Sequence, residues 1–435
     1  MAFVRLYRLI ICFTLSCLLA IAVPWHFMNP TVMAQTNPFY DSIMKMESDW
    51  QQEYENYFNT NFKFEAMDVR KMSAALQENA KLTGERTALI WIMTSGDQIN
   101  LSMLTPNHKP VSRTTLVNKA EIISTKMDFF RGVTSQHPIF RNSYLKSAQT
   151  LYDWIIKPIA ATLDIEEIDN LLFCTGPGLR TIPFGALHDG KEFLVEKYGV
   201  GVVPAFQLMT KGASRIGDRP ALAMGASTFD ELPDLPGVEI ELDTIIPNLR
   251  QGKTFLNEGF TLENLKQERA ENNYGIVHLA THAEFQSGTP DNSYIQFADE
   301  RLTLDKMDQL NWRNPPVELL VLSACRTALG DEEAELGFAG LALQSGVRAV
   351  IASLWYVSDA ASVTLMSEFY QALSQETTKI SALRQAQLAM IHKEYEQPSP
   401  ELAQLTRSAF KRESGEIDFS HPYYWAAYSL IGNPW

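Results

Sequence analysis

Two short apolar segments in the middle of the chain constrain its fold more than any other feature. The first, YGIVHLATHAEF, spans Tyr274–Phe285, and the second, ELLVLSACRT, spans Glu318–Thr327. Each is a continuous apolar run that ends in small or polar residues, which is typical of a parallel strand buried on both faces. His282 stands toward the end of the first segment, where its apolar part stops, and Cys325 holds the same place in the second. Because ligands bind outside the carboxyl ends of strands in open α/β sheets, we expect these two side chains to emerge where chemistry takes place.

Strand-like and helix-like segments alternate through the rest of the chain. The strand candidates are short apolar runs at residues 170–175, 201–205, 221–227, 275–282, 318–324 and 348–355. Helical spacing of apolar residues is found at 143–163, with a bend near Pro158, and at 238–249, 262–269, 338–345, 360–373 and 379–392. This alternation predicts parallel strands joined by crossover helices. We expect the aromatic tail HPYYWAAYSLIGNPW to close the core.

The chain before this region changes character twice. Residues 39–82 have apolar residues at helical spacing and predict two helices, the second of which is followed by Thr83-Gly84 as its end signal. We find no second copy at the roughly 34-residue period of a tetratricopeptide array, so we interpret the segment as a helical cap. From residue 87 the period becomes two, and residues 88–94 and 99–105 predict a β-hairpin. A polar loop is expected between this hairpin and residue 143.

The N-terminus predicts a targeting segment. Arg5 and Arg8 precede an apolar run at Leu9–Val23, and Val32 and Ala34 then place small residues at −3 and −1 of a cut before Gln35. The run is shorter than the roughly 20 residues that span a membrane. We therefore expect an exported protein, periplasmic or extracellular, with no stable membrane span after cleavage. A membrane anchor formed by an uncleaved signal is the alternative.

Charge and cysteine content limit the expected partners and the possible roles of the cysteines. The net charge is −14 at pH 7 and no basic cluster stands out, so nucleic acid is not an expected partner. Removal of the signal would leave two cysteines, Cys174 and Cys325. In an oxidising compartment these could form one structural disulfide, which needs Cα atoms within about 7 Å. A reactive Cys325 paired with His282 is the other interpretation.

Several motifs in order resemble the CHAT family of caspase-like cysteine peptidases, which are related to caspases and separases. They are LYDWIIKPI, GLRTIPFGALHDGKEFLVEKYGV, LPGVEIEL, HLATHAEF, LSACRT, GLALQSGVRAVIASLWYVSD and HPYYWAAYSLIG, within residues 85–433. The resemblance implies a caspase-like α/β sandwich, with a largely parallel sheet flanked by helices and preceded by a short helical segment. The chain would then consist of a signal peptide at 1–34, a helical N-terminal segment at 35–84 and a CHAT domain at 85–435.

The resemblance also implies a chemistry. Its catalytic dyad falls on His282 and Cys325, where the imidazole would favour the thiolate over a free thiol, whose pKa is about 8.5. The thiolate would attack a peptide carbonyl and form a thioester acyl-enzyme, with the backbone N–H groups of Ala283 and Cys325 facing the oxyanion. This describes a cysteine endopeptidase with a protein or peptide substrate, no metal and no organic cofactor. A regulatory protein partner is compatible with it.

Three positions near the predicted dyad bear on its activity and its choice of substrate. Ala283 stands where the family usually has glycine, and alanine would be strained if the turn there needs a positive φ. Asp359 matches an acidic position of the family and is our candidate for a pocket that selects a basic side chain. Helix N-capping by Ser358 or Asp359 is the alternative. Trp355 would line the same pocket or pack in the core.

Other classes of protein have less support. The sequence contains neither the G-x-S-x-G elbow of serine hydrolases nor a Walker A motif. His278, His282 and Cys325 cluster too loosely to predict a zinc site. The position of His278 inside an apolar run predicts a hydrogen-bonded core histidine. The serious alternative to a peptidase is a catalytically inactive caspase-like fold that serves as an interaction or scaffold module.

Overall fold

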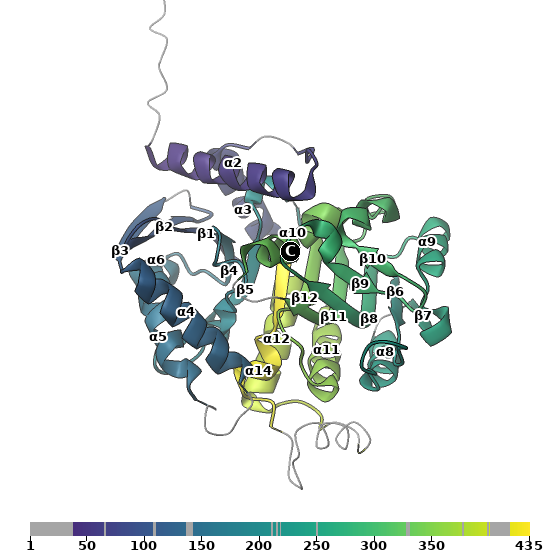
Figure 1. Cartoon of the computed structure of the whole chain (residues 1–435). Helices are drawn as coiled ribbons and strands as arrows, with labels where there is room; N and C mark the ends of the chain where they lie inside the picture. Colours follow the sequence, from purple (N-terminus) through teal and green to yellow (C-terminus); the bar gives the residue numbers. More distant parts are fainter. Residues whose placement is uncertain are drawn as a thin grey trace, which may run out of the picture. The chain divides into compact units, whose positions relative to one another are not determined.

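The structure, a computed structural model, describes residues 38–435 apart from 65–66, 108–109, 136–141, 210–211, 215, 218, 249–250, 328–330, 376–377, 398–399 and 401–417. The predicted signal peptide lies outside the described residues. Residues 43–435 form one compact unit. Its described residues build a thirteen-stranded sheet with helices on both faces (Figure 1). The predicted fold class, a largely parallel sheet flanked by helices, is confirmed.

The strands form two parallel sets that run in opposite directions. The first set is β1 (Thr87–Thr94), β4 (Asn170–Thr175), β5 (Gly199–Val203) and β13 (Tyr428–Gly432). The second set is β6 (Ala221–Gly225), β7 (Gly252–Leu256), β8 (Ile276–Phe285), β11 (Leu319–Thr327) and β12 (Ala349–Ser353). The two sets meet where β12 pairs antiparallel with β13. The aromatic tail therefore supplies a central strand that joins the two halves of the sheet.

Antiparallel strands extend the sheet on both sides. On one side, β2 (Gln98–Leu104) forms the predicted hairpin with β1 and is followed by β3 (Val111–Leu116). On the other side, β9 (Tyr294–Gln296) pairs with the end of β8 and with β10 (Arg301–Thr303). The inner strands β4, β6 and β12 are buried along their whole length, which explains their uninterrupted apolar sequences.

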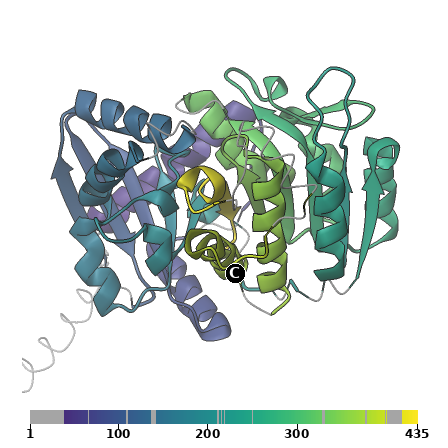
Figure 2. The same ribbon diagram turned by 90° about the horizontal axis from the view of Figure 1, so that it is seen from below.

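Helices cover both faces of the second set. α8 (Gly237–Asn248) and α11 (Asp359–Leu373) lie side by side, with α12 (Lys379–His392) next to α11 (Figure 2). α10 (Glu332–Ser345) follows β11 and packs on the opposite face. Further α-helices of the described residues, after the N-terminal pair, are α4 (Lys119–Thr134), α5 (Tyr144–Ile155), α6 (Lys157–Ile165), α7 (Leu194–Lys197), α9 (Leu262–Glu271) and α14 (Pro422–Trp425). No helix in the described residues is long and apolar enough to cross a membrane.

The two predicted N-terminal helices are α2 (Pro38–Phe58) and α3 (Val69–Thr83). Asp68 caps the start of α3, and Gly84 ends it with a φ of 78°. α2 packs closely on α10, because a Cβ on Gly340 would lie 2.5 Å from the ring of Phe58. The glycine in α10 thus permits the contact between the two helices.

Candidate active site

β8 and β11 are neighbouring parallel strands and bring the two predicted dyad residues to the same end of the sheet. Their ladder pairs His282 with Ala324 and Ala283 with Cys325, so Cys325 lies one step beyond the partner of His282. The sequence predicted that both residues end their strands. This prediction is wrong, because β8 continues to Phe285 and β11 to Thr327. The side chain of Cys325 lies outside the described part of the structure.

β8 changes its partner on its other side close to His282. Residues 276–280 pair with β6, whereas residues 283–284 pair with β9 in the opposite direction. The ladder between β8 and β11 also shifts register between Leu322 and Ala324. Neighbouring strands that separate in this way open a crevice outside their carboxyl ends, which is where ligands bind in α/β folds. His282 lies between the two paired segments of β8.

The chain segment between β6 and α8 holds His282. Its Nε2 lies 2.7 Å from the backbone carbonyl oxygen of Pro233, and its ring lies 4.8 Å from that of Phe229, centroid to centroid. A carbonyl oxygen can only accept a hydrogen bond, so Nε2 carries the proton and the neutral ring has its lone pair on Nδ1. His282 can therefore accept a proton at Nδ1. The sequence did not indicate Pro233, because a backbone carbonyl leaves no side-chain signal.

Ala283 has the ordinary backbone of a strand. It is not among the residues with positive φ, and it pairs with Cys325 on one side and Ile295 on the other. Its side chain is 1% exposed. Alanine in place of the family's glycine therefore introduces no backbone strain here. The N–H of Ala283 belongs to a strand that has neighbours on both sides.

Asp359 is the first residue of α11 and holds the N-terminus of α8. Its Oδ2 accepts a hydrogen bond from the backbone N–H of Gly237 at 2.9 Å, and its Oδ1 accepts one from the hydroxyl of Tyr356 at 3.0 Å. Ser358 occupies the N-cap position of α11 without a side-chain cap hydrogen bond. The Asp359 side chain therefore caps the N-terminus of α8, and not that of its own helix α11 as the sequence suggested. Gly237 permits this approach, because a Cβ there would lie 2.4 Å from that of Asp359.

The electrostatic surroundings of Asp359 include His282. Burial raises the pKa of the Asp359 carboxyl, and the nearby carboxylate of Glu241 acts in the same direction. The Gly237 N–H, the Tyr356 hydroxyl and, when it is protonated, the His282 imidazole oppose this rise in pKa. The acid and the imidazole are therefore within electrostatic reach of each other.

Trp355 and His278 pack in the interior. Trp355 is buried, and its indole N–H donates a hydrogen bond to the carbonyl of Tyr423 at 3.0 Å. His278 is fully buried, with Nδ1 3.1 Å from the hydroxyl of Tyr370. Its Nε2 lies 3.2 Å from Oε1 of Glu241, although the two atoms are not aligned for a hydrogen bond. Among the described residues, no group of three or more His, Cys, Asp or Glu side chains is placed to hold a metal ion.

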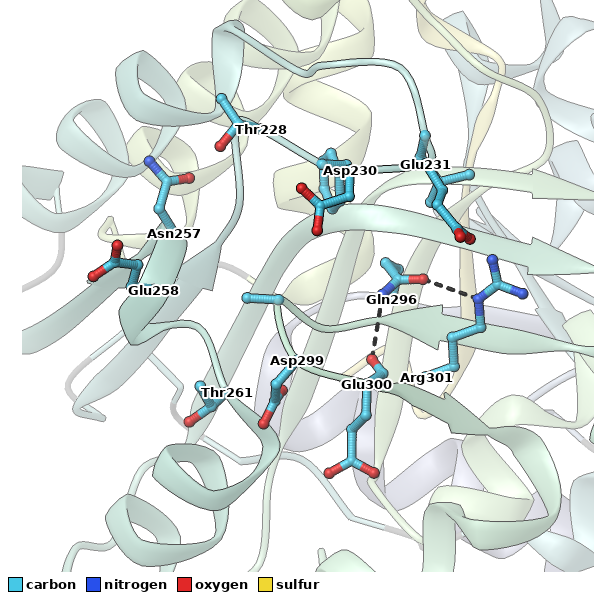
Figure 3. Close-up of a pocket in the computed structure, with 13 residues that line it drawn as sticks. Thr228, Asp230, Glu231, Asn257, Glu258, Thr261, Gln296, Asp299, Glu300 and Arg301 are labelled. Carbon is cyan, nitrogen blue, oxygen red and sulfur yellow. Dashed lines mark hydrogen bonds between the residues drawn. The ribbon is translucent and has the colours of Figure 1, made fainter.

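An acidic cleft opens beside His282. Its volume is about 610 Å³, and it lies between the loop after β6, the segment after β7 and the turn from β9 to β10 (Figure 3). Phe229, which packs on His282, forms part of its wall. The charged residues of the lining are Asp230, Glu231, Glu258, Asp299, Glu300 and Arg301. A concave wall with this excess of acid attracts cationic ligands.

The alternative of a structural disulfide is wrong. Cys174 lies in β4 as a free, buried thiol, and Cys325 lies in β11. The strands β12, β13 and β5 separate β11 from β4. At about 4.8 Å per strand the two backbones are roughly 19 Å apart, far beyond the ~7 Å that a disulfide allows. Burial, and then the carboxylate of Glu47, raise the pKa of the Cys174 thiol well above its ordinary value.

The sheet, its flanking helices and the paired strands β8 and β11 define a caspase-like α/β domain. Residues 145–433 match the CHAT domain, so the chain belongs to the CHAT family. A search of curated proteins found no match. The predicted resemblance is thus confirmed at the level of the family.

The fold is also similar to solved structures of low sequence identity. Crystal structures of the Saccharomyces cerevisiae separase–securin complex at 3.0 and 2.6 Å resolution align with TM-scores of 0.50 and 0.49, each at 10% identity. Each alignment covers 91% of this chain and 33% of the other. This chain therefore spans about a third of the length of the chain it matches, and the likeness shows a separase-like fold.

Proposed function

We propose that this chain is a cysteine endopeptidase of the CHAT type, with His282 as the base and Cys325 as the nucleophile. The observation that carries the proposal is that β8 and β11 are neighbouring parallel strands, which bring the backbones of the two residues to the same end of the sheet. The bond from His282 Nε2 to Pro233 supports it, because it fixes Nδ1 as the nitrogen that takes up a proton. Membership of the CHAT family adds further support.

The proposed reaction has two steps. In the first, Nδ1 of His282 takes the proton of the Cys325 thiol and Sγ attacks the peptide carbonyl carbon. The imidazolium then gives this proton to the leaving amine as the C–N bond breaks, which leaves a thioester. In the second, Nδ1 takes a proton from water, whose oxygen adds to the thioester, and the C–S bond breaks to return the nucleophile. We assign the oxyanion to the backbone N–H groups of Ala283 and Cys325.

Cleavage of a peptide library, read by mass spectrometry, tests this proposal. The wild-type protein should cut peptides, and His282→Ala and Cys325→Ala should each abolish cutting, because each removes one half of the dyad. Cys174→Ala is the matched control, since this thiol is buried in β4, and it should keep the activity. If Cys325→Ala and the wild-type protein are equally inactive on every peptide, the inactive interaction module replaces the peptidase as the better account.

We propose further that the substrate carries Arg or Lys before the cut. Support comes from the acidic cleft beside His282 and from Asp359, whose carboxylate lies within electrostatic reach of the same histidine. Asp359→Ala also releases the N-terminus of α8, so Glu231→Gln in the exposed wall of the cleft is the cleaner variant. At least one of the two should weaken the preference for basic residues. A cleavage profile that is unchanged in both variants would contradict this specificity.

Export of the protein is a proposal that the sequence alone supports. The apolar run at Leu9–Val23 and the predicted cleavage site after Ala34 motivate it. N-terminal sequencing of protein from the periplasmic or culture fraction should find Gln35 first. A chain that retains Met1 and stays with the membrane fraction would indicate an anchor instead.

A regulatory protein partner is also part of the proposal. The structure that aligns with a TM-score of 0.50 is a complex of separase with securin. A protein that occupies the crevice beside His282 would block the access of a substrate to the dyad. Full peptidase activity of the protein isolated directly from its source, unchanged after mild denaturation and refolding, would contradict control by a bound partner.

A further inference from the structure

A second cavity lies at the other end of the sheet from His282. Its volume is about 480 Å³, and it is formed where β5 and β13 end and β12 begins. Pro204 after β5, Gly432 at the end of β13 and Arg348 before β12 line it, and the C-terminal end of α10 closes one side. Because β12 runs parallel to β8 and β11, its first residues lie away from the ends that carry the proposed dyad. The cavity is therefore separate from the proposed peptidase site.

The lining of this cavity is positively charged, whereas the whole chain carries a net negative charge. The chain has 51 acidic and 37 basic residues, yet the lining contains Lys63, Arg313 and Arg348 and no acidic side chain. The cleft beside His282 has the opposite balance. A concave surface that gathers cations in an acidic protein concentrates a positive potential and attracts anions.

Neighbouring groups of opposite charge neutralise only part of this positive charge. Arg348 Nε lies 3.3 Å from Oε2 of Glu318, so this arginine has a carboxylate partner. The guanidinium of Arg313 lies against Gly346 at the end of α10, where a Cβ would lie 2.5 Å from its Nε, and the negative end of the helix favours a cation there. In the described part of the chain, neither Arg313 nor Lys63 makes a side-chain hydrogen bond or ion pair. Both side chains are exposed.

The rest of the wall is apolar. Phe62 and Phe64 are half-buried on one side, and Leu208, Met209 and Val347 lie among the other lining residues. The volume falls within the range of about 300–1,000 Å³ that is usual for small-molecule sites. The cavity thus combines an apolar wall with a cationic rim, and each part fits one half of an amphipathic ligand.

We propose that this cavity binds a small amphipathic anion, in which a carboxylate or phosphate group is joined to an apolar chain or ring. Arg313 is the anchor, because its planar guanidinium can donate two parallel hydrogen bonds to either headgroup. Lys63 adds a second charge. Phe62 and Phe64 cover the apolar part of the ligand. This inference does not depend on the proposed peptidase activity.

Calorimetric titration of the full-length protein tests the inference. The probes are decanoate and decyl phosphate, each below the concentration at which it forms micelles. Decanol has the same apolar chain without the charge, and acetate has the charge without the chain. We expect the better of the two anions to bind at one site at least about tenfold more tightly than decanol or acetate, because both parts of the cavity must contribute. The comparison of decanoate with decyl phosphate identifies the headgroup.

Variants locate the binding. Arg313→Gln should weaken the preferred anion about tenfold, and Arg313→Glu should weaken it more, because the guanidinium is the proposed anchor. Arg301→Gln is the matched control, since Arg301 is an exposed arginine in the acidic cleft, stacked on Tyr294. It should bind the anion as the wild type does. Binding of decanol as tight as that of both anions, affinities in the Arg313 variants within twofold of the wild type, or no binding of either anion would overturn the inference.

Discussion

Replacing Glu47 by alanine tests how the N-terminal helices are joined to the sheet. Glu47 in α2 is 0% exposed, and its carboxylate accepts hydrogen bonds from Trp91 Nε1 at 2.7 Å, from Phe206 N at 3.1 Å and from Gln207 N at 2.9 Å. Alanine would leave these three donors buried without this acceptor, and each unsatisfied donor destabilises the folded protein by about 1–3 kcal/mol. The substitution also removes the desolvation penalty of a buried carboxylate, which offsets part of this loss of stability. We therefore predict a loss of about 3 kcal/mol in the free energy of unfolding.

Urea unfolding followed by circular dichroism measures this loss, provided that the slope against urea does not change between the proteins. Asp49→Ala is the matched control, because Asp49 lies in the same helix, is 58% exposed and forms an ion pair with Lys45. Such surface pairs contribute about 0–1 kcal/mol. The reasoning is refuted if the two variants lose the same stability to within about 1 kcal/mol.

Two further predictions follow from buried contacts. Gly237→Ala should destabilise the protein by about 2–4 kcal/mol in urea unfolding, because the new Cβ would meet that of Asp359 at 2.4 Å and displace a hydrogen bond to its carboxylate. Gly176→Ala, whose Cβ would have its nearest neighbour at 3.7 Å, should cost far less, and equal losses would contradict the argument. Burial lowers the pKa of Lys379 from 10.5 to about 8, so between these values the folded protein binds fewer protons than the unfolded chain. Stability should rise with pH over this window, on the order of 3 kcal/mol in all, and Lys379→Met should remove that rise. Unfolding curves at several pH values decide this, and a rise of equal size in both proteins would count against it.

Much of the fold could be predicted because the buried parallel strands leave a strong local signal. Strands covered on both faces must be apolar throughout, and the sequence therefore placed β4, β6, β8, β11 and β12. The bend expected near Pro158 is confirmed, since α5 ends at Ile155 and α6 begins at Lys157.

Elements that depend on distant partners were missed. Residues 119–134, expected within a polar loop, form α4, and residues 428–432 form a central strand only because β12 and β5 lie on either side. α10 begins at Glu332, earlier than the apolar spacing indicated. Acidic residues in its first turn are favoured by the helix dipole, and this favourable contribution leaves no hydrophobic pattern.

In the candidate site, too, some residues were predictable from local sequence and their distant contacts were not. His282 and Cys325 could be assigned to neighbouring strands from their apolar runs, although not to the correct strand ends, and no pattern indicated the carbonyl of Pro233 that selects the tautomer of the histidine. It offered Asp359 as a cap or a pocket acid without indicating Gly237, the residue it holds. Backbone groups and contacts between residues far apart in the chain have no local sequence pattern, and only the folded chain brings them together.

The rate of alkylation of Cys325 tests the central claim most directly. Iodoacetamide labelling of the unreduced protein at several pH values, read by mass spectrometry, compares Cys325 with Cys174, whose buried thiol should react slowly because its pKa is raised. We predict that Cys325 reacts much faster, with an apparent pKa below 8.5 that rises in His282→Ala. If Cys325 reacts as an ordinary thiol and its pKa does not respond to His282→Ala, the two residues do not form a dyad.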